Sequence, residues 1–480
     1  MEDAYLFQVL KTLTTSEMEE LRVFAGSDYF GHRHFHQEAL ALLTLILKNS
    51  GLHPVADWSK EDLFQQLFPH QTFIKGKLEK VMSELNKLVR AFLLWQQYYR
   101  PENEFNQLFD WAVLLRQRGL EPRYQQTLNK VSKLQEDEGF RENMYYYRQF
   151  LLEYEIHDWQ SLFNRKKGDL NIPNTLQNLD IFYYLNRLEL LNRFLLQSRA
   201  TYLEIPELLA FALEETQIPE RYLQENSVLL ITYKIHQVLK NQNPMPEEFE
   251  ELGNLLLRHE EEISPTLLRQ FYAYLRNLCV LLLNSGSSGM LETLHRLQRD
   301  NLQRGYLYYN ELLPPSAFLS VTDIGLKVKN LDWVKQFIER HRDMILGDNE
   351  TKDFYRLGLA YYYFETGQFE NALDCIPANP QGTDFLLKSR RLELMAYYEL
   401  DSELLPYKLD AYKMFISRAS HKLIPSRSKE FNTNFINLLI QLVASVPGDK
   451  DRSQRLLERI KSKQAVAEQE WLLKKAAAIG

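Results

Sequence analysis

The sequence contains little cysteine, glycine and proline, and each shortage excludes a class of protein. Of the 480 residues, 2 are cysteine, 18 are glycine and 17 are proline. Two cysteines cannot form the disulfide framework of a secreted mini-protein, so we expect reduced, buried thiols at Cys279 and Cys375 and a cytoplasmic location. The low glycine and proline content excludes collagen-like and linker-like chains, and it is low for an all-β protein with many tight turns.

Long hydrophobic runs and targeting segments are missing too. The most apolar stretch covers residues 278–283 and is much shorter than the roughly 20 residues that span a bilayer. The sequence starts with Met-Glu-Asp-Ala-Tyr and has no basic segment followed by an apolar one, which a signal peptide needs. We therefore expect no membrane partner and no leader.

The charge balance is slightly acidic. The chain carries 57 Lys and Arg residues against 64 Asp and Glu residues, a formal charge of −7. Such a surface has no overall attraction for nucleic acid or anionic membranes, so we do not expect nucleic acid as a partner, although a local basic stripe is compatible with this balance. Hydrophobic residues make up 45% of the chain, which excludes wholesale disorder.

Apolar residues recur at spacings of three and four throughout the chain, whereas strict alternation is almost absent, so the pattern predicts an all-α fold. Capping chemistry marks expected helix starts: Ser16 with Glu19, Ser59 with Asp62, and Ser264 before Pro265. Expected helix ends carry a glycine that can adopt a left-handed conformation. These glycines are Gly51, Gly119, Gly139, Gly168, Gly305 and Gly367.

From about residue 103 onward the expected helices come in pairs. The pairs repeat on the order of every 35 to 45 residues, which is the period of helical-hairpin solenoids. We therefore predict an α-α superhelix over residues 101–480. Three of its expected helices matter below: Glu207–Glu215, Pro219–Leu239 and Asp451–Lys475.

One segment resembles a tetratricopeptide repeat. Residues 356–373 read RLGLAYYYFETGQFENAL, with small residues at Ala360 and Ala372, aromatic residues at Tyr363 and Phe369, and a turn residue at Gly367. The segment departs from the family pattern in two places. Arg356 stands where a large apolar residue is usual, and Pro377 shortens the second helix.

Two fainter copies of the pattern occur at residues 394–405, where Asp401 replaces the turn glycine, and at 110–128, around Gly119. The chain is thus similar to a divergent tetratricopeptide-like array. The resemblance implies a right-handed superhelix whose inner surface holds a peptide or protein partner, and it implies no catalysis.

Residues 1–100 differ from the rest, because several short helices are expected before a longer one over Lys75–Tyr99. We interpret this helical unit as the cap of the array, which shields the apolar face of the first repeat. The long helix begins with Lys75, Lys77 and Lys80. An alternative is therefore a helix-turn-helix-like unit that contacts DNA.

Several clusters of residues have the composition of a possible metal, phosphate or charged binding site. His32 and His36, with His34 between them, would face one way on a helix, at a spacing seen in metal sites; solvated or locally bonded histidines are the simpler interpretation. Gly286–Gly289 lacks the Lys-Ser/Thr end of a phosphate-binding loop and is interpreted as a turn. Two charged sets remain: an acidic set interpreted as a solvated face (Glu247, Glu248, Glu250, Glu251, Glu260, Glu261, Glu262) and a C-terminal basic set interpreted as a face for an acidic patch of a partner or of the chain itself (Arg452, Arg455, Arg459, Lys461, Lys463).

The sequence therefore predicts a noncatalytic scaffold that binds a protein or peptide on the concave face of a helical array. No catalytic, cofactor-binding or metal-binding residue is assigned, and the pattern identifies neither the partner-binding residues nor the oligomeric state. Two alternatives stay open. One is a transcriptional regulator whose N-terminal unit contacts DNA, and the other is an enzyme with a site between repeats.

Overall fold

The computed structural model describes residues 5–48, 59–163, 171–201, 217–241, 243–348, 351–420, 422–463 and 465–480. In these ranges the chain is all-α, as expected, and the extended pairings are two isolated bridges, Tyr309–Leu312 and Leu313–Ile345. Contacts divide the chain into two compact units, Met1–Glu138 and Gly139–Gly480. The first unit extends past residue 100 and includes a helical hairpin that the sequence interpretation assigned to the array.

The first unit is built around its longest helix, α6 (Lys77–Tyr98), which contacts α1, α2 and α3. Its core includes the fully buried rings of Phe7, Phe64 and Phe92. The other helices are α1 (Tyr5–Leu10), α2 (Thr15–Ala25), η1 (Asp28–Phe30), α3 (His36–Lys48), α5 (Lys60–Leu67), η2 (Pro101–Asn103), α7 (Glu104–Gln117) and α8 (Glu121–Glu136).

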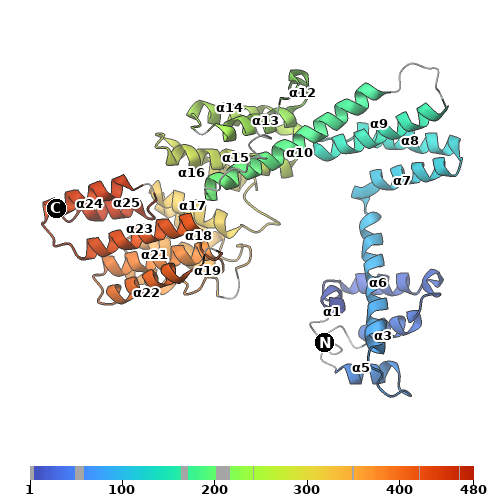
Figure 1. Cartoon of the computed structure of the whole chain (residues 1–480), viewed down its shortest axis with the longest axis horizontal. Helices are drawn as coiled ribbons and strands as arrows, with labels where there is room; N and C mark the ends of the chain where they lie inside the picture. Colours follow the sequence, from blue (N-terminus) through green and yellow to red (C-terminus); the bar gives the residue numbers. More distant parts are fainter. Residues whose placement is uncertain are drawn as a thin grey trace. The chain divides into compact units, whose positions relative to one another are not determined.

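The second unit begins with helices that share one hydrophobic core, and neighbours in sequence pack on each other (Figure 1). The α10 helix packs on both α9 and α13, and α15 packs on α14 and α16. These helices are α9 (Asn143–Phe163), α10 (Ile172–Thr201), α12 (Glu220–Glu225), α13 (Ser227–Lys240), α14 (Pro246–Arg258), η3 (Glu260–Glu262), α15 (Pro265–Asn284) and α16 (Met290–Gln303).

The C-terminal part of this unit, yellow to red in Figure 1, shares a second core. Here each helix contacts its sequence neighbour, and alternate helices also meet: α17 packs on α19, α19 on α21, and α23 on α25. The helices are α17 (Pro315–Lys327), α18 (Leu331–Arg340), α19 (Asp353–Glu365), α20 (Phe369–Cys375), α21 (Thr383–Glu399), α22 (Leu405–Arg418), α23 (Ser426–Val443), α24 (Lys450–Ser462) and α25 (Gln469–Ala477).

Helix starts follow the capping chemistry with one exception. Ser59 with Asp62 forms the expected capping box, and Ser264 accepts from the Leu267 amide before Pro265. The α2 helix starts two residues earlier than the Ser16–Glu19 pair predicts, because Thr14 and Glu17 form the reciprocal box instead. Thr14 and Glu17 have the same spacing as Ser16 and Glu19, and they bond to each other's backbone amides at the start of the helix.

Helix ends agree with three of the predicted glycines. Gly119, Gly305 and Gly367 adopt the left-handed conformation. Gly139 does not, so its prediction is wrong. Gly51, Gly168 and the helix expected over residues 207–215 lie outside the described residues.

Two expected helices are broken in the structure. The segment over residues 219–239 divides at Asn226, whose side chain caps α13 through the Leu229 amide, at 2.7 Å. The segment over residues 451–475 divides after Ser462, and α25 starts behind Glu468, which has a positive φ of 52°. Apolar spacing continued across both breaks, so periodicity alone did not reveal them.

The segment that resembles a tetratricopeptide repeat forms the hairpin of α19 and α20. Gly367 makes the turn with a φ of 76°, and Ala360 and Ala372 are fully buried. Asp401 takes the same left-handed conformation, with a φ of 49°, between α21 and α22. The second helix ends at Cys375, shortly before Pro377.

Two glycines inside helices allow the helices of this region to approach closely. A Cβ atom at Gly358 of α19 would lie 2.6 Å from Cε1 of Phe318 on α17, and one at Gly325 of α17 would lie 2.5 Å from Cγ2 of Val334 on α18. At Gly253 of α14 the nearest atom would be Leu275 Cδ2 at 3.9 Å, an ordinary contact. Only the first two glycines therefore exclude a larger residue by packing.

We expect Gly358→Ala and Gly325→Ala each to lower the free energy of unfolding by about 1–3 kcal/mol, because the added methyl group overpacks a tight contact. Gly253→Ala is the matched control. It should raise stability by up to about 1 kcal/mol, because alanine favours a helix more than glycine does. Urea unfolding followed by circular dichroism measures all three, and a stabilising Gly358→Ala would contradict the packing argument.

His236 on α13 is a buried histidine held neutral in the core. Its Nδ1 donates to Asn192 Oδ1 at 2.9 Å, and the Asn192 amide donates to the Thr232 carbonyl. Burial lowers the pKa of His236 to about 4, and nearby Lys240 and Arg187 add to the effect. The folded chain therefore binds a proton here less readily than the unfolded chain, whose histidine has a pKa near 6.5.

The stability that neutral His236 contributes is complete above pH 6.5 and is lost as the pH falls toward 4. The loss should reach about 3 kcal/mol, since each unit of pKa difference corresponds to about 1.4 kcal/mol. We expect His236→Gln to flatten the fall in unfolding free energy between pH 7 and pH 4.5. Parallel curves for the variant and the unaltered chain would contradict this prediction.

Candidate functional site

The three histidines near the N-terminus do not share one face of a helix. His32 and His34 are exposed on the loop between η1 and α3, and α3 begins only at His36. His36 is buried and bonds through Nε2 to the Ala25 carbonyl at 2.8 Å. The helical spacing considered for the triplet is therefore wrong, and no group of three His, Cys, Asp or Glu residues in the described ranges is placed to hold a metal ion.

The acidic set divides into two kinds of environment. Glu247, Glu250, Glu251, Glu261 and Glu262 are exposed, as a solvated face predicts. Glu260 is half-buried and holds Arg304 and Tyr306. Glu260 is thus an ion-pair partner within the chain, and so is the exposed Glu251, which pairs with Lys234.

The C-terminal basic set is partly used inside the chain. Arg452 donates to Ser445 Oγ and to the Gln441 carbonyl, Arg459 donates to Gln441 Oε1, and Lys463 donates to Asn434 Oδ1. These bonds attach α24 and its end to α23. The interpretation of the set as a docking face therefore does not apply to these three residues.

The two thiols are free. Cys279 is buried, and burial raises its pKa to about 11. Cys375 is only half-buried at the end of α20, which corrects the expectation of two buried thiols, and burial raises its pKa as well. Since the thiolate is the reactive form, both are poor nucleophiles near neutral pH.

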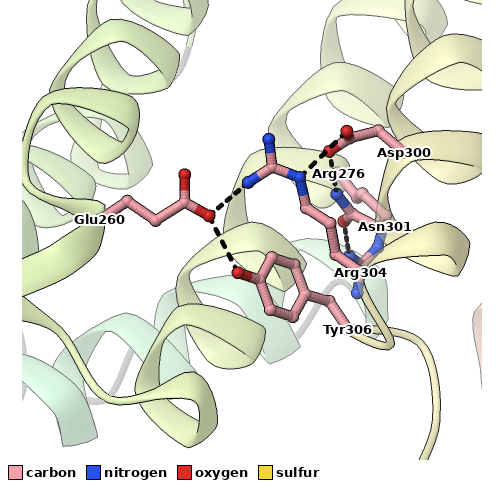
Figure 2. A network of polar contacts seen from close by, with 6 residues as sticks. All are labelled: Glu260, Arg276, Asp300, Asn301, Arg304 and Tyr306. Atoms are coloured by element: carbon pink, nitrogen blue, oxygen red, sulfur yellow. Dashed lines mark hydrogen bonds and ion pairs between the residues drawn. The ribbon is translucent and has the colours of Figure 1, made fainter.

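A polar network, the Arg304 network, connects η3, α15 and α16 (Figure 2). Its members are Glu260, Arg276, Asp300, Asn301, Arg304 and Tyr306. Arg304 pairs with Glu260 and with Asp300, whose Oδ1 lies 3.0 Å from Nε, and the Tyr306 hydroxyl donates to Glu260 Oε1 at 3.0 Å. Arg276 donates to the buried Asn301.

The Arg304 network balances its own charges, with two guanidinium groups facing two carboxylates. Burial lowers the pKa of Arg276 to about 10, still far above neutral pH. The ring of Tyr306 stacks on Tyr272, with 5.1 Å between the ring centroids. Because both carboxylates are already paired, the arrangement fixes the end of the α15–α16 hairpin and leaves no free acid or base for catalysis.

A second polar group, the Lys388 cluster, lies on alternate helices of the C-terminal part. Its members are Asp323 and Lys327 on α17, Tyr361 on α19, Lys388 and Arg391 on α21, and Glu468 at the start of α25. Arg391 is its anchor: Nε bonds Glu468 Oε1 at 2.9 Å and Nη1 bonds Asn432 Oδ1 at 2.9 Å. The Tyr412 hydroxyl donates to the same Asn432 oxygen at 2.7 Å.

The members of the Lys388 cluster influence each other's pKa. Burial lowers the pKa of Lys388, and Arg391 lowers it further against the opposing effect of Asp323. Burial raises the pKa of Tyr361, and nearby Glu468 adds to this effect. For Lys327 burial acts downward, but Asp323, 3.1 Å away, and neighbouring acids raise the pKa overall.

Burial is the largest influence on the pKa of Lys327, Tyr361 and Lys388, although none of these side chains is fully enclosed. Lys327 keeps 45% of its side chain exposed, and Tyr361 and Lys388 are half-buried. Such a combination is expected for side chains that have protein atoms on several sides without being covered. The partly covered surface formed by Lys327, Tyr361 and Lys388 is called the recess below.

Two donors in this recess have no partner. Neither the Lys388 ammonium nor the Tyr361 hydroxyl makes a hydrogen bond or ion pair with any residue of the described ranges. A desolvated ammonium without a partner is costly. The recess therefore suits a ligand that brings an acceptor, above all a carboxylate.

Lys388 and Arg391 were not singled out from the sequence. A signal was present, because Lys388-Ser-Arg-Arg places three cations within four residues of a helix that is otherwise mostly apolar and aromatic. The contribution of Glu468 had no such signal, because it comes from a residue 77 positions away.

Comparison with known proteins gave no match to a protein-family model, a curated protein or a solved structure. Within the described ranges, no helix combines the length and apolar character needed to cross a membrane.

Arg391 and Lys388 should differ sharply in their contribution to stability. Arg391→Met leaves the Glu468 carboxylate without its ion-pair partner and removes one of the two donors to Asn432 Oδ1, so we expect the unfolding free energy to fall by about 3–5 kcal/mol. Lys388→Met removes an unpaired, desolvated charge and should leave stability unchanged or slightly raised. Urea unfolding compares the two, and equal losses would show that Lys388 has a structural partner after all.

Proposed function

We propose that the chain is a noncatalytic scaffold that binds a peptide segment of a protein partner in the recess around Lys388. The observation that carries the proposal is the pair of unpartnered donors, Lys388 and Tyr361, beside the anchored guanidinium of Arg391. A protein segment with an acidic side chain supplies the missing acceptor and gains a charge-assisted hydrogen bond in a partly desolvated setting.

The arrangement of helices supports this proposal. The cluster comes from α17, α19, α21 and α25, and the contacts of α17 with α19 and of α19 with α21 bring first helices of successive hairpins together. In a tetratricopeptide-like superhelix, as the segment 356–373 suggests, such helices line the inner face. The recess is then part of a concave groove in which an extended segment contacts several hairpins at once.

The chemistry of the recess favours binding over catalysis. Both of its carboxylates are already ion-paired: Asp323 pairs with Lys327, and Glu468 pairs with Arg391. The free thiols of Cys279 and Cys375 are compatible with action in a reducing compartment, so we place the scaffold in the cytoplasm.

A random peptide library displayed on phage tests the proposal directly. We expect selection on the immobilised full chain to enrich peptides that share an acidic residue, and Lys388→Met to weaken the enriched peptides at least tenfold in fluorescence polarisation. Tyr361→Phe should weaken them less, because it removes one neutral donor.

Lys335→Met is the matched control, because Lys335 is an exposed lysine on α18, outside the cluster. Peptides should bind this variant as they bind the unaltered chain. The proposal fails if no peptide is enriched, or if the enriched peptides bind equally well to the Lys388→Met variant.

A further inference from the structure

The first unit contains a basic hollow between α6 and the loop that precedes α3. The hollow has a volume of about 790 Å³ and is wide open to solvent. On the loop side it is lined by Arg33, His34 and Phe35, and on the α6 side by Lys80, Ser83, Glu84, Lys87, Arg90, Ala91 and Leu94.

Positive charge is concentrated in the hollow. Four cations, Arg33, Lys80, Lys87 and Arg90, face one carboxylate, Glu84. Residues 75–100 carry six Lys and Arg residues against two Glu residues, although the whole chain is acidic. The expectation against nucleic acid rested on the total charge, which does not describe this local surface.

The four cations differ in whether they are paired within the chain. Glu84 is buried and pairs with Lys87 at 3.0 Å and with Arg33 at 3.5 Å, so it restrains these two side chains, which stay partly exposed in the hollow. Lys80 and Arg90 are exposed and make no hydrogen bond or ion pair with any residue that the structure describes. These two are available for an anionic ligand.

The spacing along α6 fits a chain of charges. Lys80, Lys87 and Arg90 share one face of the helix, and Lys80 and Arg90 are separated by a rise of about 15 Å. A stacked nucleic-acid strand carries one phosphate per about 3.4 Å, so this face spans about four phosphates.

Rings on the adjoining loop favour a nucleic-acid strand over an acidic peptide. Phe35 lines the hollow, and the centroids of the Phe35 and His34 rings lie 4.1 Å apart. Tyr29 of η1 and His32 of the loop are exposed. Aromatic side chains beside a basic groove are the means by which proteins hold single strands, because bases stack on the rings. The loop also recesses the basic face of α6, which hinders insertion of this helix into a duplex groove.

We propose that this hollow binds the phosphate backbone of a single-stranded nucleic acid, independently of the peptide site around Lys388. Lys80 and Arg90 contact phosphates as unpaired cations, Arg33 and Lys87 contact phosphates while they pair with Glu84, and Phe35 and His34 stack on a base.

Fluorescence anisotropy with a labelled oligothymidine of about 12 nucleotides tests the proposal on the full chain. With four phosphate contacts, the logarithm of the binding constant should fall with the logarithm of salt concentration with a slope of about −3. Lys80→Gln combined with Arg90→Gln should halve the slope and lower the affinity at low salt at least tenfold. Phe35→Leu should weaken binding roughly fivefold or more with an unchanged slope, because it removes stacking and no charge.

Arg118→Gln combined with Lys130→Gln is the matched control, because it removes the same charge from exposed positions of α7–α8. This pair should bind as the unaltered chain does, and circular dichroism verifies the fold of each variant. The proposal is overturned by absence of binding at low salt, by an equal loss in the control pair, by tighter binding of a duplex, or by preferential displacement of the strand with polyglutamate.

Discussion

The C-terminal part of the chain depends on how closely α17 and α19 approach each other. Phe318 of α17 lies where any side chain at position 358 of α19 would be, so glycine there sets the distance between the two hairpins. A wider separation would move Tyr361, three residues further along α19, away from Asp323 of α17. The packing of Phe318 on Gly358 thus determines how close the polar side chains of α17 and α19 lie to each other in the recess.

Charge in this protein is used in two distinct ways. In the Arg304 network, carboxylates and guanidinium groups pair within the chain and hold a hairpin end in place. Around Lys388, Arg391 pairs with Glu468, and in the basic hollow of the first unit Lys87 pairs with Glu84. Other cations beside each of these ion pairs remain unpaired. This surplus of donors is what both proposed binding sites have in common, and the total charge of the chain gives no information about it.

The sequence predicted the helices well because apolar spacing and capping are local properties. The hairpin around Gly367 and the left-handed turn at Asp401 were both visible in the pattern. Breaks at Asn226 and after Ser462 were not, since each depends on a side chain capping or a backbone turn within a continuous apolar stripe. The recess combines α17, α19, α21 and α25, whose proximity no local pattern encodes. Its chemistry therefore required the structure.

The second unit has two large hydrophobic cores, and a small cluster of Cys279, Leu294 and Ile324 lies where they adjoin. Fewer buried apolar side chains meet at this boundary than in either core, although Gln298 also donates to Ser320 and the rings of His295 and Trp333 lie 5.0 Å apart across it. Denaturant should therefore separate the two halves before it melts them, and the thiol of Cys279 would become reactive toward a labelling reagent at that moment. This cysteine is a built-in reporter of partial opening within the unit.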